Sequence, residues 1–247
     1  KEEIKALLLE IDKARGITEE KGRPPLGNIY DISYIGITKK GGSLTMANLL
    51  QVSYNIETAS AMKKYLKGSG LTRYEEVLED HERLGNEIKR CIISEDEMAD
   101  NASPELRRIR RETARMNDRV RSRLESIISS EHYKNVLQDA IVTIRDGRYV
   151  VPVKQEYRSS FPGMILDHSS SGATVFIEPQ AVVDLNNQLK DLLANEKREI
   201  ARILMELSDR VGENYYGLMN DLKLLVSLDQ IFAKALFSIE YDGSGPE

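Results

Sequence analysis

Few residues of this sequence have the types and spacing that catalysis requires. The first candidate is Gly36–Ser43 (GITKKGGS), which has the outline of a phosphate-binding loop. Gly42 stands where that loop requires lysine, and without the lysine ammonium the β- and γ-phosphates of a nucleotide lose their main cation. The preceding segment also lacks the pattern of a buried strand. We therefore interpret Gly36–Ser43 as a plain turn.

Metal-binding and nucleophilic residues are equally sparse. His81, His132 and His168 lie far apart, with no His-x3-His spacing and no cysteine pair, so the sequence predicts no metal site. We expect His81 and His132 on helix surfaces and His168 in a turn, with contact to a ligand as the alternative for His168. The serines 169–171 lack both a nucleophile elbow and a His–Asp set. We expect no catalytic centre in this chain, and Cys91 as a small buried apolar residue.

Local charge is the feature that stands above background. The formal net charge is −5, so nothing in the overall balance indicates nucleic acid. From residue 105 to 123, however, eight arginines face only three acidic residues. The arginines are Arg107, Arg108, Arg110, Arg111, Arg115, Arg119, Arg121 and Arg123.

This arginine stripe has two interpretations. In the favoured one, the arginines pair with acidic residues of a returning helix as flanking salt bridges of a coiled coil. In the other, part of the stripe faces phosphate, which the planar guanidinium pairs with bidentately. The acidic candidates for the first interpretation are Asp184, Asp191, Glu196 and Glu199.

A second group of basic residues surrounds two hairpins that are predicted within residues 141–179. Acidic neighbours oppose them, namely Asp146, Glu156, Asp167 and Glu178. Contacts to a nucleic-acid backbone need no base-reading aromatic residues, and aromatic residues are only 6% of the chain. The candidate nucleic-acid contacts are Arg145, Arg148, Lys154, Arg158, His168, Ser169 and Ser170.

A long helix is predicted for residues 104–140. Ser103 is a plausible N-cap, and Pro104 suits the first helical position. The apolar spacing that follows is close to a heptad repeat and fades near residues 129–130, which indicates a helix packed along one partner. Its members are Leu106, Ile109, Thr113, Met116, Val120, Leu124 and Ile127.

Residues 141–179 predict a small β unit. Two β-rich runs flank Asp146-Gly147, which is a strong hairpin signal. A second hairpin is indicated by residues 164–167 and 173–177, on either side of a polar loop. Four short strands bury little core, so the unit is expected to sit on another element.

Residues 180–239 predict a returning helix. Apolar residues recur every three or four positions, apart from one longer step past Glu196, and from Gln180 to about Phe237 they favour one helix of roughly 85 Å. Gly212 and Gly217 are positions where it could bend. With the helix of residues 104–140 it would form a long antiparallel coiled-coil lever, with the β unit at its tip.

The remaining residues predict a mainly α protein with a small β insertion. Residues 1–103 alternate helical stretches with turns and form a helical core, and residues 240–247 are linker-like. Both ends are expected to continue into a larger protein. No apolar run approaches about 18 residues and no signal peptide is indicated, so we expect no membrane partner. A single cysteine is compatible with a cytoplasmic location.

Five segments closely resemble the MutS-two family, a bacterial paralogue of the mismatch-repair MutS proteins. The longest are Asp146–Lys154 (DGRYVVPVK) and Ser170–Pro179 (SSGATVFIEP). Phe161–Gly163 (FPG), Val183–Asn187 (VDLNN) and Arg23–Gly27 (RPPLG) also match. The resemblance covers most of the chain.

The resemblance implies a MutS domain III/IV-like core, lever and clamp. Family members continue into an ATPase domain that uses ATP and Mg, and typically into a Smr nuclease domain. Neither is in this sequence, so we expect no enzyme activity and no cofactor here. The family is associated with homodimers that clamp branched or duplex DNA and suppress recombination. Some members are instead linked to splitting collided ribosomes, with rRNA as the contact. A structural coiled-coil adaptor is a third alternative.

Overall fold

The computed structural model describes residues 2–241 and 243. The chain divides into two compact units, residues 1–102 with 202–247 (unit 1) and residues 103–201 (unit 2). Unit 1 is helical, and unit 2 combines helices with one four-stranded antiparallel sheet. The predicted class, mainly α with a small β insertion, is confirmed. Most of the predicted linker at residues 240–247 lies outside the described residues.

Unit 1 is built around helix α7 (Tyr215–Glu240). Its apolar side packs against α1 (Glu2–Lys21) and α2 (Met46–Leu66) in one core, in which Phe232, Met62 and Leu66 are almost fully buried. Thr45 caps the start of α2, because its hydroxyl accepts from the backbone N–H of Asn48 at 3.2 Å. The other elements of this unit are a 3₁₀ helix (Ser33–Lys40), α3 (Thr72–Val77), α4 (Glu82–Cys91) and the end of α6 (Val183–Glu213).

The predicted single helix of residues 180–239 is two helices. A short 3₁₀ turn (Gln180–Val182) leads into α6, which ends at Glu213, and α7 begins at Tyr215. At Asn214 the side-chain amide donates to the carbonyl of Arg210 at 2.8 Å, so it competes with the backbone for the acceptor that would continue the helix. Gly212 and Gly217, where a bend was predicted, flank this break.

Helix α5 (Pro104–Ile128) begins as predicted and ends earlier. Ser103 caps it by accepting from the N–H of Leu106 at 2.9 Å. All seven predicted heptad residues are buried or half-buried. Beyond Ile128 the chain turns, and residues 136–138 bond to strand β2 in place of the helix predicted up to residue 140. The sheet takes these residues because Leu137 and Val136 cover its apolar core.

The sheet of unit 2 is formed by the two predicted hairpins. Strands β1 (Thr143–Arg145) and β2 (Arg148–Lys154) join through Asp146 and Gly147, whose φ angles of 50° and 72° suit a type I′ turn. Strands β3 (Gly163–His168) and β4 (Thr174–Pro179) form the second hairpin, and the strand order is β1-β2-β4-β3. A 3₁₀ turn (Gln155–Tyr157) follows β2.

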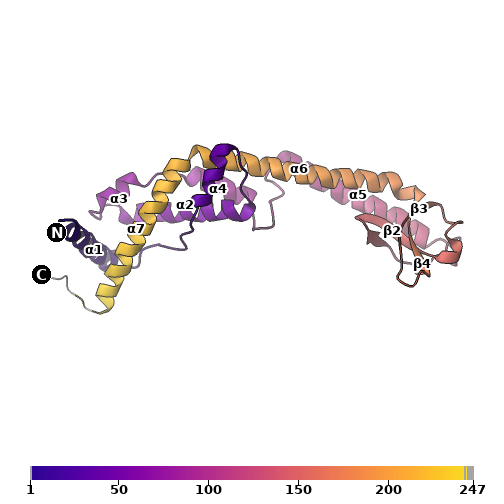
Figure 1. Ribbon diagram of the computed structural model, residues 1–247, viewed down its shortest axis with the longest axis horizontal. Coiled ribbons are helices and arrows are strands. Elements are labelled where there is room, and N and C mark those ends of the chain that lie inside the picture. The colour runs from indigo at the N-terminus through magenta and orange to yellow at the C-terminus, as the bar shows by residue number, and fades with distance from the viewer. Residues whose placement is uncertain (1, 242, 244–247) are drawn as a thin grey trace. The chain divides into compact units, whose positions relative to one another are not determined.

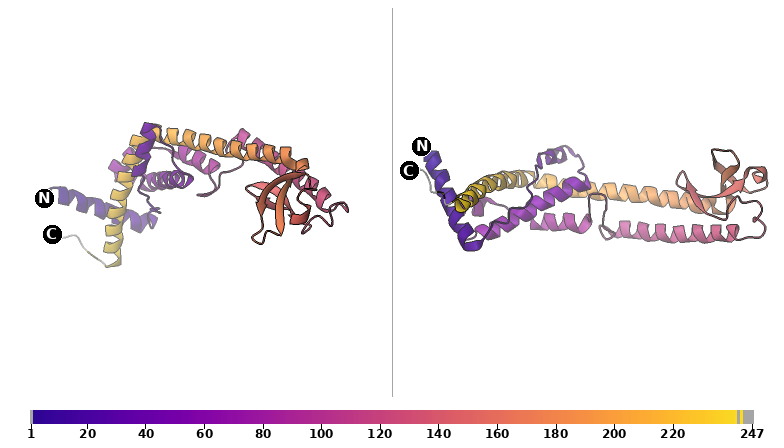
Figure 2. Two further views of the ribbon diagram at one scale, coloured as in Figure 1. Left: turned by 45° about the vertical axis from the view of Figure 1, so that its right-hand side comes forward. Right: turned by 90° about the horizontal axis from the view of Figure 1, so that it is seen from below.

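One face of this sheet packs on the end of α5, as expected for a sheet too small to hold its own core. Val151, Val153, Val175 and Ile177 meet Val120 and Leu124 of α5. Within unit 2, α5 and the first part of α6 run side by side in opposite directions, with the sheet where α5 ends (Figure 1). Figure 2 shows the same arrangement from two further directions.

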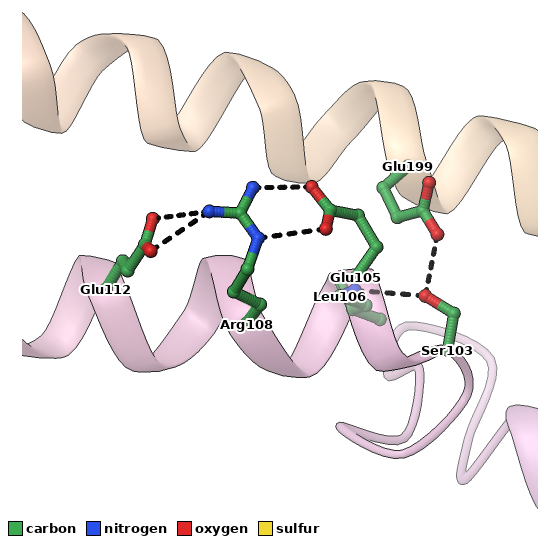
Figure 3. Close-up of polar contacts among 6 residues, drawn as sticks. All are labelled: Ser103, Glu105, Leu106, Arg108, Glu112 and Glu199. Atoms are coloured by element: carbon green, nitrogen blue, oxygen red, sulfur yellow. Dashed lines mark hydrogen bonds and ion pairs between the residues drawn. The ribbon is translucent and has the colours of Figure 1, made fainter.

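Polar contacts join α5 and α6 of unit 2 near the start of α5. The hydroxyl of Ser103 donates to the carboxylate of Glu199 at 2.6 Å, and both residues are buried (Figure 3). Arg110 bonds Glu196 at 2.7 Å across the two helices. These carboxylates occupy the longer apolar step that the sequence shows past Glu196, so polar bonds replace apolar contact there.

We expect Ser103→Ala to lower the free energy of unfolding by about 1–3 kcal/mol, because the variant loses the helix cap and one donor to a buried carboxylate. Urea denaturation followed by circular dichroism measures the change. Ser122→Ala, which removes an exposed hydroxyl of the same helix, is the matched control and should have almost no effect. Equal stability of the two variants would show that the cap carries no such energy.

Candidate nucleic-acid interface

Among the residues that the structure describes, Arg110 is the arginine of the stripe that pairs with α6. Arg110 bonds Glu196, whereas Arg108 bonds Glu105 at 2.6 and 2.9 Å and Glu112 at 2.9 Å on its own helix (Figure 3). The predicted partners Asp184 and Asp191 form no ion pair with α5 in the part of the chain that the structure describes. Arg115 and Arg119 line one cavity together with Asp191 but lie beyond ion-pair distance of it.

Six other arginines of α5 are exposed. Among the described residues, no carboxylate lies within ion-pair distance of any of them, so their donors face solvent. They are Arg107, Arg111, Arg115, Arg119, Arg121 and Arg123.

Arg148 lies inside the fold and not on the predicted contact surface. Its guanidinium bonds both carboxylate oxygens of Glu178, at 2.8 and 2.7 Å, and the side-chain oxygen of Asn187 at 2.8 Å. Only 16% of the Arg148 side chain is exposed, and Glu178 is fully buried. Because its donors are taken up within the chain, Arg148 is a positioning residue.

Two asparagines of α6 complete the surroundings of this ion pair. The amide of Asn186 donates to Glu178 at 2.7 Å and to the carbonyl of Tyr149 at 3.1 Å. The network therefore joins β2, β4 and the first turn of α6. Sequence reasoning missed it as a unit, although these residues all lie in the segments that carry the family resemblance.

Arg145 lies on the face of the sheet away from α5. Its guanidinium bonds Asp167 at 3.0 Å and stacks 3.9 Å from the ring centre of Phe176. The side chains of Arg145 and Asp167 are 35% and 48% exposed, so solvent screens this pair. Arg145 thus presents a fixed, accessible positive charge.

The other candidate contacts divide into exposed and bonded residues. Arg158, His168 and Ser170 are exposed. The ammonium of Lys154 donates to the carbonyl of Asn135 at 3.0 Å and remains half-exposed. Ser169 shapes the β3–β4 turn, because its hydroxyl accepts from the N–H of Thr174 at 3.0 Å. The accessible cations at the sheet are therefore Arg145, Lys154 and Arg158.

His81 was predicted on a helix surface, and that prediction is wrong. Its side chain is 7% exposed, and Nε2 lies 3.5 Å from Glu79 and 3.8 Å from the buried Asp221 of α7. Gly217 permits this approach, because a Cβ there would lie 2.8 Å from His81 Nε2. Burial lowers the pKa of His81 and raises the pKa of Asp221 to about 6.

Further predictions concerned the single cysteine, the glycine-rich segment, metal sites and membrane-spanning helices. Cys91 is buried, as predicted. Gly36–Ser43 contains the end of the 3₁₀ helix and a turn. Within residues 2–241 and 243, no set of three His, Cys, Asp or Glu side chains is placed to hold a metal ion. In the same residues, no helix has the length and apolar character needed to cross a membrane.

The chain is similar over nearly its full length to proteins named Endonuclease MutS2. It is 44% identical over 250 residues to the one from Alkaliphilus oremlandii (strain OhILAs), which covers 97% of this chain and 31% of that protein. It is 41% identical over 257 residues to the one from Halothermothrix orenii, covering 98% and 32%. The chain thus spans about a third of the length of these relatives. No family model matches it.

We expect Arg148→Leu to destabilise unit 2 by about 3–5 kcal/mol, because it leaves the buried Glu178 carboxylate without its cation. Thermal unfolding followed by circular dichroism measures the loss. Arg145→Leu removes the same side chain from an exposed pair and should cost about 1 kcal/mol or less. Similar losses in both variants would contradict the structural role of Arg148.

We expect Asp221→Asn to stabilise the protein by about 1–3 kcal/mol near pH 7.5. The folded-state pKa of Asp221, about 6, lies above the ordinary value of an aspartate. The contribution of protonated Asp221 to folding stability is therefore fully present at low pH and is lost as pH rises through about 6. The variant's advantage should vanish near pH 4, and thermal unfolding across pH measures it. An advantage that does not change with pH would rule out this origin.

Proposed function

Because this chain belongs to the MutS2 family, over a segment about a third as long as its relatives, we propose that it is the lever and clamp part of a MutS-like clamp protein. The paired helices α5 and α6 serve as the lever, and the sheet β1–β4 serves as the clamp. The clamp grips branched or duplex DNA through the phosphate backbone, without reading sequence, and thereby contributes to suppressing homologous recombination.

The observation that carries this proposal is the way charge is arranged at the sheet. A buried ion pair joins β2 to β4 and is bonded to Asn186 and Asn187 of α6. Around it, the sheet unit presents three accessible cations, namely Arg145, Lys154 and Arg158. Cations fixed on a rigid support suit phosphate contacts, which position a protein on nucleic acid without specifying bases. Asp167 offsets part of this positive charge, so the contacts of one clamp with phosphate would be weak. A closed ring of two clamps would combine several such weak contacts.

The remaining roles belong to the full-length protein. We propose that this segment performs no catalysis and that ATP and Mg bind to an ATPase domain elsewhere in the polypeptide. A homodimer in the cytoplasm would bring two clamps around one nucleic acid. The paired helices would then transmit the nucleotide state of the ATPase to the clamps.

Binding of the chain to a fluorescent four-way DNA junction tests the proposal. We expect Lys154→Glu with Arg158→Glu to weaken binding by about tenfold or more, and to reduce the slope of log K against log salt by about 0.9 for each lost phosphate contact. Fluorescence anisotropy over a salt series measures both. Lys223→Glu with Lys234→Glu makes the same charge change on α7 and is the control.

Two results would overturn the DNA assignment. One is binding without salt dependence and without any effect of the clamp variant. The other is co-sedimentation of the chain with ribosomes in the absence of junction binding, which would assign the same surface to rRNA. Circular dichroism of each variant verifies that it is folded.

A further inference from the structure

A groove runs along one side of the helix pair in unit 2. Three neighbouring cavities form it, and each shares residues with the next: Arg119 belongs to the first and second, and Arg123 and Ser126 to the second and third. The third cavity, of about 300 Å³, lies where α5 meets the sheet and the loop before β3. These shared residues place the three cavities next to one another along α5, and together we call them the groove.

Two unpaired arginines mark the part of the groove nearest the sheet. Arg119 and Arg123 are exposed, lie one helical turn apart, and are about 6 Å apart along the axis at 1.5 Å per residue. Glu112 and Asp191 line the first cavity and Asp118 the second, whereas the described lining of the third contains Arg123 and no carboxylate. An anionic ligand is therefore favoured at the third cavity.

Aromatic rings gather at this same cavity. Tyr133 and Phe161 line it, with ring centres 4.9 Å apart, and the exposed ring of His132 meets Tyr133 edge-on at 4.7 Å. Further apolar lining comes from Ile127, Pro162, Pro179 and Ala181, and Ser126 and Ser130 also line the cavity. The cavity thus combines an apolar, ring-lined interior with a cation at its edge.

We propose that this groove binds single-stranded nucleic acid, with phosphates on Arg119 and Arg123 and one base against Tyr133. A basic groove with aromatic side chains is how proteins hold single strands without sequence preference. A duplex cannot use the cavity in this way, because its bases are stacked inside the helix. The inference rests on the proposed nucleic-acid partner and adds a site for the unpaired strand of branched DNA.

Binding of fluorescein-labelled oligothymidylate of about 12 nucleotides to the 247-residue chain tests the arginines. We expect Arg119→Gln with Arg123→Gln to weaken binding by about tenfold and to reduce the salt slope by about 1.4, since each phosphate contact contributes about 0.7 for single strands. Arg107→Gln with Arg111→Gln removes the same charge from exposed positions of α5 outside the groove. Equal losses in the two variants would overturn the site.

The aromatic part of the proposal has its own test. Tyr133→Leu keeps an apolar side chain but removes the ring, so we expect oligothymidylate binding to weaken by about fivefold or more. Binding of an abasic strand of the same length should be unchanged. His132→Ala removes the exposed ring that meets Tyr133 edge-on, and it is the second variant if Tyr133→Leu unfolds. Equal loss of both strands would mean that no base occupies the cavity.

The two nucleic-acid proposals fail independently. Junction binding without oligothymidylate binding would overturn the groove and leave the clamp in place. Oligothymidylate binding that survives the clamp variant, with junction binding absent, would support the groove alone. If an amphipathic peptide of leucine and glutamate binds the groove and oligothymidylate does not, the site takes an acidic helix and the proposal is wrong.

Discussion

The buried ion pair between Arg148 and Glu178 is the contact on which unit 2 depends. A four-stranded sheet covers little apolar surface, and a fully buried carboxylate without a cation costs several kcal/mol, as an order of magnitude. The guanidinium of Arg148 and the amide of Asn186 satisfy Glu178 from β2 and from the first turn of α6. Small errors in how the strands meet the helix would break these bonds. The network therefore fixes the sheet on its support.

The helix pair beneath the sheet relies on a different balance of forces. Apolar residues such as Leu124 and Leu189 are buried along it, while Ser103–Glu199 and Arg110–Glu196 supply polar bonds where the apolar repeat is interrupted. Polar pairs at one level fix how two helices align, because sliding would leave carboxylates unpaired in a partly buried site. The same register turns most arginines of α5 outward, so they contribute charge rather than interhelical bonds.

This division between buried and accessible charge supports the proposed roles. Arg148 is largely buried and positions the sheet, whereas Arg158 is exposed to solvent. The sequence predicted both arginines as nucleic-acid contacts, but their burial gives them different roles. On α5, Arg108 is satisfied by Glu105 and Glu112. Arg123, in contrast, borders a cavity lined by rings, and Arg119 borders the neighbouring cavity. A clamp surface and a single-strand groove on one rigid unit would suit a nucleic acid with both paired and unpaired segments.

The sequence by itself determined the features that depend on residues close together in the chain. Asp146-Gly147 specified a hairpin, Ser103-Pro104 began a helix, and the heptad spacing selected the buried side of α5, because each depends on local backbone preference or periodicity. Only the tertiary structure decided the state of Arg148 and His81. Their burial depends on Glu178, and on Asp221 and Gly217 of α7, which approach from far along the chain. The charge of a side chain follows from the residue type alone, whereas its solvent exposure depends on the residues that pack against it.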